Sequence, residues 1–231
     1  MSSMYEHIMT LPLFKGASFA RMSEVIETLP MDFLRFGQGE VIASAGEACT
    51  HVKFVLSGAV EIVVKWSGEL SLTQTLKAPD VICPDFLFGM NNAYPGEIIA
   101  AVQETSILQI SKADYLKVLK ADEVFMFNYL NLLARDAQLS LTLPQSLLPA
   151  TDAERIACWM YGATQSEAHD IVLRYEAESL CRLLGMSHQQ LLDAVQQLSE
   201  VEGISCTFGK ISVASRRVLR RLTTAALGKR Q

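Results

Sequence analysis

Positively charged side chains are concentrated at the C-terminal end of this 231-residue chain. Residues 204–231 contain seven Lys and Arg residues and no Asp or Glu, whereas the other 203 residues hold 13 basic and 25 acidic groups. A basic segment on an acidic body is typical of a surface that binds nucleic acid, because each cation can neutralise a phosphate. The alternative is a solvated face that only improves solubility. Charge alone leaves both interpretations open.

Two short helices are predicted directly before this basic segment. The first ends at Leu184 and is followed by Gly185, and Ser187 can cap a second helix that runs to Leu198. Two helices joined by a short turn with glycine form a helix-turn-helix, whose second helix enters the major groove of DNA. Two predicted strands, Ile204–Thr207 and Lys210–Val213, then form a hairpin wing. We therefore expect a DNA-binding domain.

The polar side chains of this region suggest how DNA is held. Gln189 or Gln190 can pair with adenine, and His188 can donate to guanine N7. Asp193 repels a polyanion unless Arg182 or a cytosine amine offsets its charge. The second helix contains no Lys or Arg, so phosphate contacts must come from elsewhere, with Arg220 and Arg221 among the available cations. The predicted DNA-binding residues are Arg182, Ser187, His188, Gln189, Gln190, Asp193, Lys210, Arg216 and Arg217.

Short strands separated by turns are predicted between Met31 and Ile110. Runs such as Val52–Leu56 and Ala59–Val64 are β-branched or alternate in polarity, and glycine-containing turns separate the runs. This spacing favours an antiparallel barrel or jelly roll. The expected fold class is therefore α+β, with a β-barrel, a long helix and a C-terminal winged helix-turn-helix.

The long helix is expected from about Ala113 to Thr142. Five small or apolar residues on it step by 3, 4, 3 and 4 positions, which is the spacing of a narrow helix–helix seam. The seam predicts a two-fold homodimer, and the alternative is packing on the chain's own barrel. The predicted dimer-interface residues are Phe127, Leu130, Ala134, Ala137 and Leu141.

Two prolines, Pro144 and Pro149, break this helix and predict a hinge. They divide the chain into an N-terminal domain at residues 1–145 and a C-terminal domain at residues 146–231. A helix capped by Thr151 or Asp152 is expected to open the second domain.

Several classes of protein are not expected. The five cysteines lie far apart without a CxxC pair, and no secretory signal or membrane-spanning stretch is visible, so we expect a cytoplasmic protein. An oxygenase barrel needs two or three His and a carboxylate, but the barrel segment holds only His51. Neither a P-loop nor a GxSxG or HExxH motif is present. We expect neither an enzyme nor a bound metal ion.

The order of the motifs resembles that of the cyclic-AMP receptor protein/FNR family of bacterial regulators over nearly the whole chain. The barrel segment is similar to the cyclic-nucleotide-binding fold at Gly39–Ile42, Ala45–Glu47 and Phe54–Ile62, and the C-terminal segment at Ser179–Ser187 and Gly203-Ile204. The resemblance implies a dimeric transcription regulator that binds DNA and responds to a small-molecule effector, with RNA polymerase as a further partner.

The chain departs from this family in the effector cassette. Where nucleotide-binding members carry a Gly-Glu pair and an Arg-Ser or Arg-Thr pair, our alignment places Cys83-Pro84 and Ile98-Ile99. An apolar pair cannot replace the hydration of a cyclic phosphate, so we do not expect cyclic AMP to bind. The effector pocket, of unknown ligand, is instead predicted to be apolar and lined by Cys83, Phe86, Ile98, Ile99 and Val102.

Other cofactors of the family fit less well or remain open. No cysteine precedes Cys49, so we expect no iron–sulfur cluster of the FNR type. Haem is an alternative, because His51, His7 or a Met side chain could ligate iron. A redox switch at Cys49 and Cys83 is another alternative, although buried cysteines usually pack as small apolar groups.

The second helix also departs from the family. Relatives that read DNA usually carry Arg, Glu and Arg where this chain has His188, Gln189 and Asp193. Either the chain reads a different DNA sequence, or it is a ligand-sensing or protein-interaction module whose winged helix no longer reads DNA.

Overall fold

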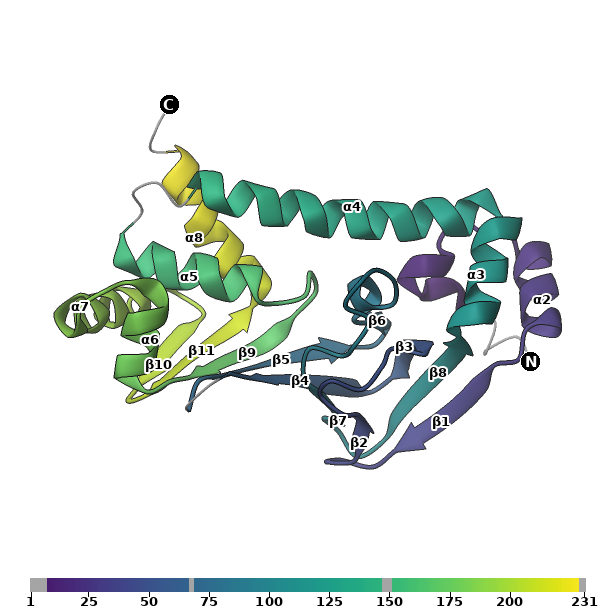
Figure 1. Ribbon diagram of the computed structural model, residues 1–231, viewed down its shortest axis with the longest axis horizontal. Coiled ribbons are helices and arrows are strands. Elements are labelled where there is room, and N and C mark those ends of the chain that lie inside the picture. The colour runs from purple at the N-terminus through teal and green to yellow at the C-terminus, as the bar shows by residue number, and fades with distance from the viewer. Residues whose placement is uncertain (1–7, 67–68, 147–150, 229–231) are drawn as a thin grey trace. The chain divides into compact units, whose positions relative to one another are not determined.

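A computed structural model describes residues 8–66, 69–146 and 151–228, except for the side chains of residues 136, 139–146 and 224–228 (Figure 1). The chain forms two compact units. The N-terminal unit contains residues 1–62 and 76–135, and the C-terminal unit contains residues 63–75 and 136–231. The chain therefore enters the C-terminal unit twice, whereas the sequence predicted one crossing at residue 145.

The N-terminal unit is a β-sandwich covered by helices. One sheet has the strand order β1-β8-β3-β6, and β2, β7 and β4 are neighbours in the other. The strands are β1 (Asp32–Phe36), β2 (Val41–Ala43), β3 (His51–Ser57), β4 (Ala59–Lys65), β5 (Ser71–Lys77), β6 (Asp80–Ile82), β7 (Glu97–Ala100) and β8 (Thr105–Ser111). The helices are η1 (Pro12–Phe14), α2 (Phe19–Thr28), η2 (Pro84–Phe86), α3 (Lys112–Ala121) and the start of α4 (Glu123–Ser146).

Apolar side chains on alternate positions of β3 and β8 build the core of this unit. Phe54 stands opposite Leu108 in the antiparallel register, and both are fully buried. Phe14 of η1 packs on Phe54 with ring centroids 5.3 Å apart and on Phe125 of α4 at 5.5 Å. The core therefore fixes the first turns of α4 against the sandwich.

The long helix expected from Ala113 to Thr142 is two helices. Asp122, in extended conformation, separates α3 from α4. Its carboxylate accepts a hydrogen bond from the backbone N–H of Val124 at 2.8 Å and pairs with Arg21 of α2 at 2.7 Å. The capping bond begins a new helix at this point, so the prediction of one continuous helix was wrong.

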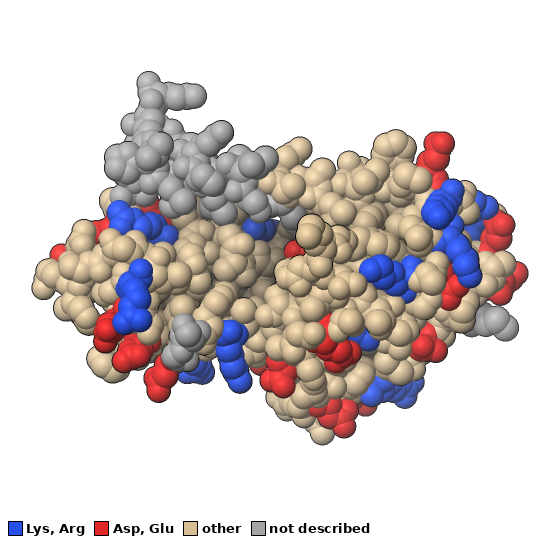
Figure 2. Space-filling view, in the orientation of Figure 1, with Lys and Arg blue, Asp and Glu red and all other residues tan. Residues whose placement is uncertain are grey.

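The predicted seam of α4 lies on the solvent side of the helix. Phe127 is 60% exposed and Leu130 is 49% exposed, and Ala134 and Ala137 are exposed as well. The side chain of Leu141 lies outside the described residues. Phe125 and Tyr129, on another face, enter the core, so this helix does not use the seam to pack on its own barrel. Residues 124–134 of α4 include no charged side chain, in keeping with the mostly uncharged surface that Figure 2 shows along this helix.

The C-terminal unit is a winged helix with an extended sheet. Its sheet has the order β10-β11-β9-β5, so the tip of the β4–β5 hairpin contributes a strand. The helix expected after the prolines begins at a capping box between Thr151 and Glu154. The elements are α5 (Asp152–Gly162), β9 (His169–Arg174), α6 (Ala177–Leu184), α7 (His188–Ser199), β10 (Ile204–Thr207), β11 (Lys210–Ser215) and α8 (Arg216–Gly228). The sequence did not predict β9, and it predicted the strand at Leu70–Leu76 as part of the barrel.

Among the helices that the structure describes, none is both long enough and apolar enough to cross a membrane.

Candidate nucleic-acid interface

The turn between α6 and α7 has the geometry that the sequence predicted. Gly185 ends α6 in the left-handed conformation, at φ +63°. The Ser187 hydroxyl accepts a hydrogen bond from the backbone N–H of Gln190 at 3.3 Å, and the Gln190 side chain accepts one from the backbone N–H of Ser187 at 2.8 Å. This capping box fixes the start of α7. It also occupies Gln190 and Ser187, two of the predicted DNA-binding residues, in helix capping.

The outer face of α7 carries the remaining candidate base-reading groups. His188, Gln189 and Asp193 are exposed, whereas Leu191, Ala194 and Leu198 are buried in the unit's core. The Gln189 side-chain amide donates a hydrogen bond to the Asp193 carboxylate at 2.9 Å. Gln189, which can pair with adenine, is therefore hydrogen-bonded to Asp193, whose negative charge repels the DNA phosphates.

The predicted cations lie in different environments. Arg182 is exposed on α6 and pairs with Glu178 one turn earlier at 2.8 Å, not with Asp193. Lys210 is half-buried at the start of β11, and Arg217, Arg220 and Arg221 are exposed on α8. Lys229 and Arg230 of the basic tail lie outside the described residues.

Arg216 does not lie on the surface that the sequence predicted. It is only 7% exposed, and its guanidinium donates two hydrogen bonds to the backbone carbonyl of Tyr161, at 3.0 and 3.2 Å. The same guanidinium stacks over the Tyr161 ring, 4.0 Å from its centroid. Arg216 thus ties α8 to α5, and we withdraw it from the candidate phosphate contacts.

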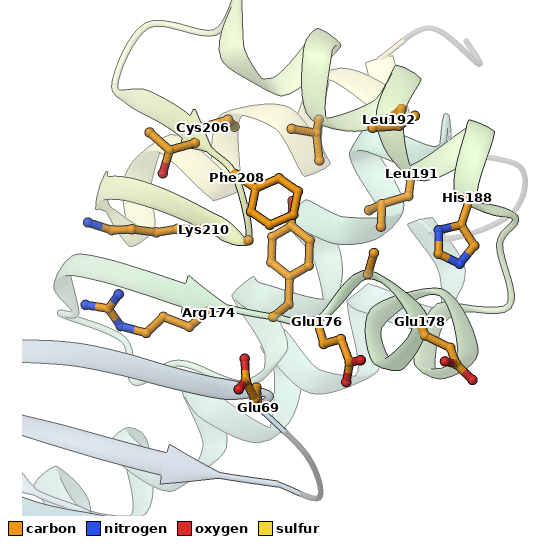
Figure 3. Close-up of a pocket in the computed structure, with 15 residues that line it drawn as sticks. Glu69, Arg174, Glu176, Glu178, His188, Leu191, Leu192, Cys206, Phe208 and Lys210 are labelled. Atoms are coloured by element: carbon orange, nitrogen blue, oxygen red, sulfur yellow. The ribbon is translucent and has the colours of Figure 1, made fainter.

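A groove of roughly 1210 Å³ lies between α7 and the wing. Figure 3 shows Leu191 and Leu192 of α7 on one side, Arg174 and Lys210 on the other, and Phe208 between them. Leu192 is 64% exposed and Phe208, at the wing turn, is fully exposed. Three carboxylates, those of Glu69, Glu176 and Glu178, also border the groove. The groove therefore combines an apolar floor with charges of both signs.

Sequence reasoning missed three groups on this face. Arg174 is the last residue of β9, a strand that the sequence analysis did not recognise. Leu192 breaks the polar pattern of the outer α7 face, and Phe208 is an aromatic residue in a glycine turn. An apolar residue at an exposed helix or turn position was the available signal for the last two.

The predicted effector residues do not assemble into one lining. Cys83 and Ile98 are buried, Phe86 and Ile99 are half-buried, and Val102 is 41% exposed on a loop. Ile98 and Ile99 are neighbours on β7 and so point to opposite faces of the sheet. The apolar effector pocket lined by these five residues stays a prediction.

Buried thiol and hydroxyl groups gather near this region. Burial raises the pKa of Cys49 to about 11, and a hydrogen bond links Cys49 with Tyr94. Burial likewise raises the pKa of Cys83, which has a left-handed backbone at φ +45°. Residues 78–111 contain no Lys, Arg or His. A buried cation, Lys53 on β3, donates to Gln109 of the neighbouring strand at 2.5 Å, and burial lowers its pKa.

The candidate haem ligands are dispersed. His51 begins β3, and its Nδ1 lies 2.9 Å from the Thr50 hydroxyl. His7 lies outside the described residues. Within the part of the chain that the structure describes, no group of three His, Cys, Asp or Glu side chains could hold a metal ion.

The sequence and the fold were compared with protein families and with solved structures. Residues 33–122 match the family model of the cyclic nucleotide-binding domain. The catabolite activator protein of Thermus thermophilus superimposes with a TM-score of 0.52 at 18% identity, over 93% of this chain and 99% of that one. DNR from Pseudomonas aeruginosa (TM-score 0.45, 15% identity, 96% and 98% covered) and a CooA mutant from Carboxydothermus hydrogenoformans (TM-score 0.47, 16% identity, 90% and 92% covered) are also similar.

No curated protein matches the sequence significantly. The likeness to the Thermus protein shows the fold, in which a β-sandwich, a long helix and a winged helix follow one another. Residues 33–122 thus match the cyclic nucleotide-binding domain, and nearly the whole chain has the fold of the Thermus catabolite activator protein.

Proposed function

We propose that this protein is a DNA-binding transcription regulator of the CRP/FNR type, and not an enzyme. The observation that carries the proposal is the pair α6–α7, with its left-handed Gly185 and its capped second helix, followed directly by the β10–β11 wing. A helix-turn-helix with a wing presents its second helix to the major groove. Arg217, Arg220 and Arg221 on α8 and Lys210 on the wing supply the phosphate contacts that α7 itself lacks.

The regulator acts as a homodimer in the cytoplasm and works with RNA polymerase, by analogy with the fold's regulators. The exposed seam of α4 supports the dimer, because two large apolar side chains, Phe127 and Leu130, face solvent on one protomer. The five cysteines, which all lie in the described part of the chain, form no disulfide, and this suits a reducing compartment.

The effector is a small molecule other than a cyclic nucleotide. The 34 residues from 78 to 111 offer no cation to a cyclic phosphate, and the ammonium of Lys53 is held by Gln109. Asp85 and Glu97 instead place carboxylates in this segment. Burial of an anion there would be unfavourable, which supports a neutral or apolar effector.

The experiment that tests DNA binding is selection of bound sequences from random duplexes, followed by fluorescence anisotropy at 50 and 200 mM salt. Enrichment of a two-fold symmetric site, bound at least about a hundredfold more tightly than random DNA, is the expected result. Binding that is equal for all sequences, or absent at 50 mM salt, would overturn the proposal.

A second candidate function is protein interaction through the winged helix. The observation in its favour is the groove beside α7, where exposed Leu192 and Phe208 stand next to the carboxylates of Glu176 and Glu178. DNA-binding faces are usually more polar and more basic. Failure of the selection experiment, with a folded dimer in hand, would favour this candidate.

A further inference from the structure

The β4–β5 hairpin departs from the sandwich to which its other residues belong. Its tip, residues 63–75, belongs to the C-terminal unit, whereas Ile62 and Leu76 on either side belong to the N-terminal unit. Strand β5 itself therefore crosses the boundary. We propose that this hairpin tip is an integral fourth strand of the winged helix, which completes its core and links the position of the wing to that of the hairpin.

Backbone pairing extends without interruption from the hairpin to the wing. Ser71 of β5 stands opposite Arg174 of β9, which stands opposite Lys210 of β11, which in turn stands opposite Thr207 of β10. Without β5, strand β9 would be an unpaired edge. Because hydrogen bonds fix the register of each pair, a shift of β5 along β9 must also disturb the row that ends at the wing.

The hairpin also supplies part of the hydrophobic core. Leu70 and Leu72 are 4% and 0% exposed and belong to the same core cluster as Ile156, Ile171 and Leu173. A winged helix made of residues 136–231 alone would expose the apolar surface that these two leucines cover. The hairpin therefore contributes to the stability of the unit through burial as well as pairing.

Two further contacts hold the hairpin in place. The side-chain carbonyl of Gln74, itself buried, accepts a hydrogen bond from the backbone N–H of Gln165 at 2.7 Å. Trp66 packs on Trp159 of α5, with ring centroids 5.2 Å apart and planes inclined at 58°. The chain contains only these two tryptophans, so their contact is a natural reporter of hairpin docking.

The test compares two matched variants of the full-length protein by hydrogen exchange without DNA. Leu72→Ala and Leu76→Ala remove the same side chain from fully buried positions on one strand, on opposite sides of the unit boundary. Leu72→Ala should accelerate exchange in β9 and β11 by roughly tenfold or more, whereas Leu76→Ala should act mainly on the sandwich. Equal acceleration of β9 by both variants, or none by Leu72→Ala, would overturn the inference.

The tryptophan pair gives a second readout, in which the wild type and the two Trp→Phe variants do not depend on the folding of the core variants. Two indoles in contact produce a coupled pair of circular-dichroism bands, which the wild type should show. Trp66→Phe and Trp159→Phe should each abolish the pair, and Leu72→Ala should reduce it. A wild-type spectrum without coupled bands would mean that the hairpin is not docked in solution, and would overturn the inference. Neither measurement uses DNA, so their outcome does not depend on whether the proposed function is correct.

Discussion

The Gln189 side chain donates a hydrogen bond to Asp193, one turn further along α7, with 2.9 Å between Nε2 and Oδ1. Both residues lie on the exposed face of this helix. To pair with adenine through both groups of its amide, Gln189 must present its carbonyl oxygen and a free N–H to the base edge. Asp193 therefore has two separable effects on DNA binding, one through its charge and one through the orientation of Gln189.

Three substitutions separate these effects. Asp193→Asn removes the charge but keeps an acceptor for Gln189, so affinity should rise severalfold for all sequences alike. Asp193→Ala should also raise general affinity but lower the preference for the selected site, and Gln189→Ala should cost about 1–3 kcal/mol on that site alone. Anisotropy titrations on selected and random duplexes measure both quantities. Unchanged affinity for Asp193→Asn would show that this carboxylate does not approach DNA.

Neighbouring arginines at the start of α8 should behave differently. Arg216→Ala removes two buried hydrogen bonds to the Tyr161 carbonyl and the stacking on its ring, and should cost about 2–4 kcal/mol of unfolding free energy. Arg217→Ala changes an exposed residue and should leave stability unchanged. It should instead reduce the salt dependence of DNA binding by about one unit of slope. Chemical denaturation and salt titrations together check the contrast, which equal unfolding free energies for the two variants would contradict.

The dimer prediction can be tested with two matched apolar-to-Glu substitutions. Ala134→Glu places a carboxylate in the exposed seam of α4, so two carboxylates would face each other across a two-fold axis. Leu116→Glu, on the exposed side of α3, is the control because that helix carries no predicted interface. Light scattering should give a monomer mass for the first variant and a dimer mass for the second. A dimer mass for both variants would show that the α4 seam is not the dimer interface.

Helix and strand boundaries could largely be predicted from the sequence, because the residues that cap a helix or form a turn lie next to the boundary they set. Gly185 correctly predicted the end of α6, and Ser187 correctly predicted the start of α7. A left-handed residue and a capping hydroxyl both act within a few positions. The break at Asp122 was missed although its capping bond to Val124 is local, and its second partner, Arg21, lies about a hundred residues earlier. The burial of Arg216 was missed as well. Its type suggests a phosphate contact, whereas its partner, Tyr161, is distant in sequence.

The hairpin strand marks the limit of such reasoning most clearly. Leu70–Leu76 was expected as one strand of one barrel, and its alternation predicts a strand equally well in either unit. Only the tertiary pairing with β9 assigns Ser71–Thr75 to the winged helix. Among the predicted effector residues, Ile98 and Ile99 are consecutive in a strand and so point to opposite faces of the sheet.

Cyclic nucleotides give a direct test of the effector proposal. Calorimetry with cyclic AMP or cyclic GMP should show no saturable heat up to about 1 mM, where binding corresponds to only about −4 kcal/mol. The physical reason is the lack of any cation in residues 78–111. A control with the Lys53→Met variant should give the same result. Micromolar binding that this variant abolishes would identify Lys53 as a phosphate ligand and contradict the proposal.

The buried thiols predict how stability depends on alkaline pH. Burial raises the pKa of Cys49 to about 11 in the folded protein, whereas a thiol in the unfolded chain titrates near its ordinary pKa of 9.0. The folded state therefore keeps its proton where the unfolded state loses it, so this stabilising contribution is complete below pH 9 and is lost as the pH rises to 11. Cys83, whose pKa is also raised by burial, acts in the same direction.

Urea midpoints measured between pH 7 and 11 should accordingly fall above pH 9, and the fall should be shallower in Cys49→Ala than in the wild type. Cys206→Ala is the matched control, because that thiol is only half-buried on the wing. Alkylation should follow the same order at pH 8: Cys206 should react first, since the nucleophile is the thiolate and access is greatest there. Rapid alkylation of Cys49 or Cys83 at pH 8 would show that these thiols are exposed and ionised in solution, and would revive them as a redox switch.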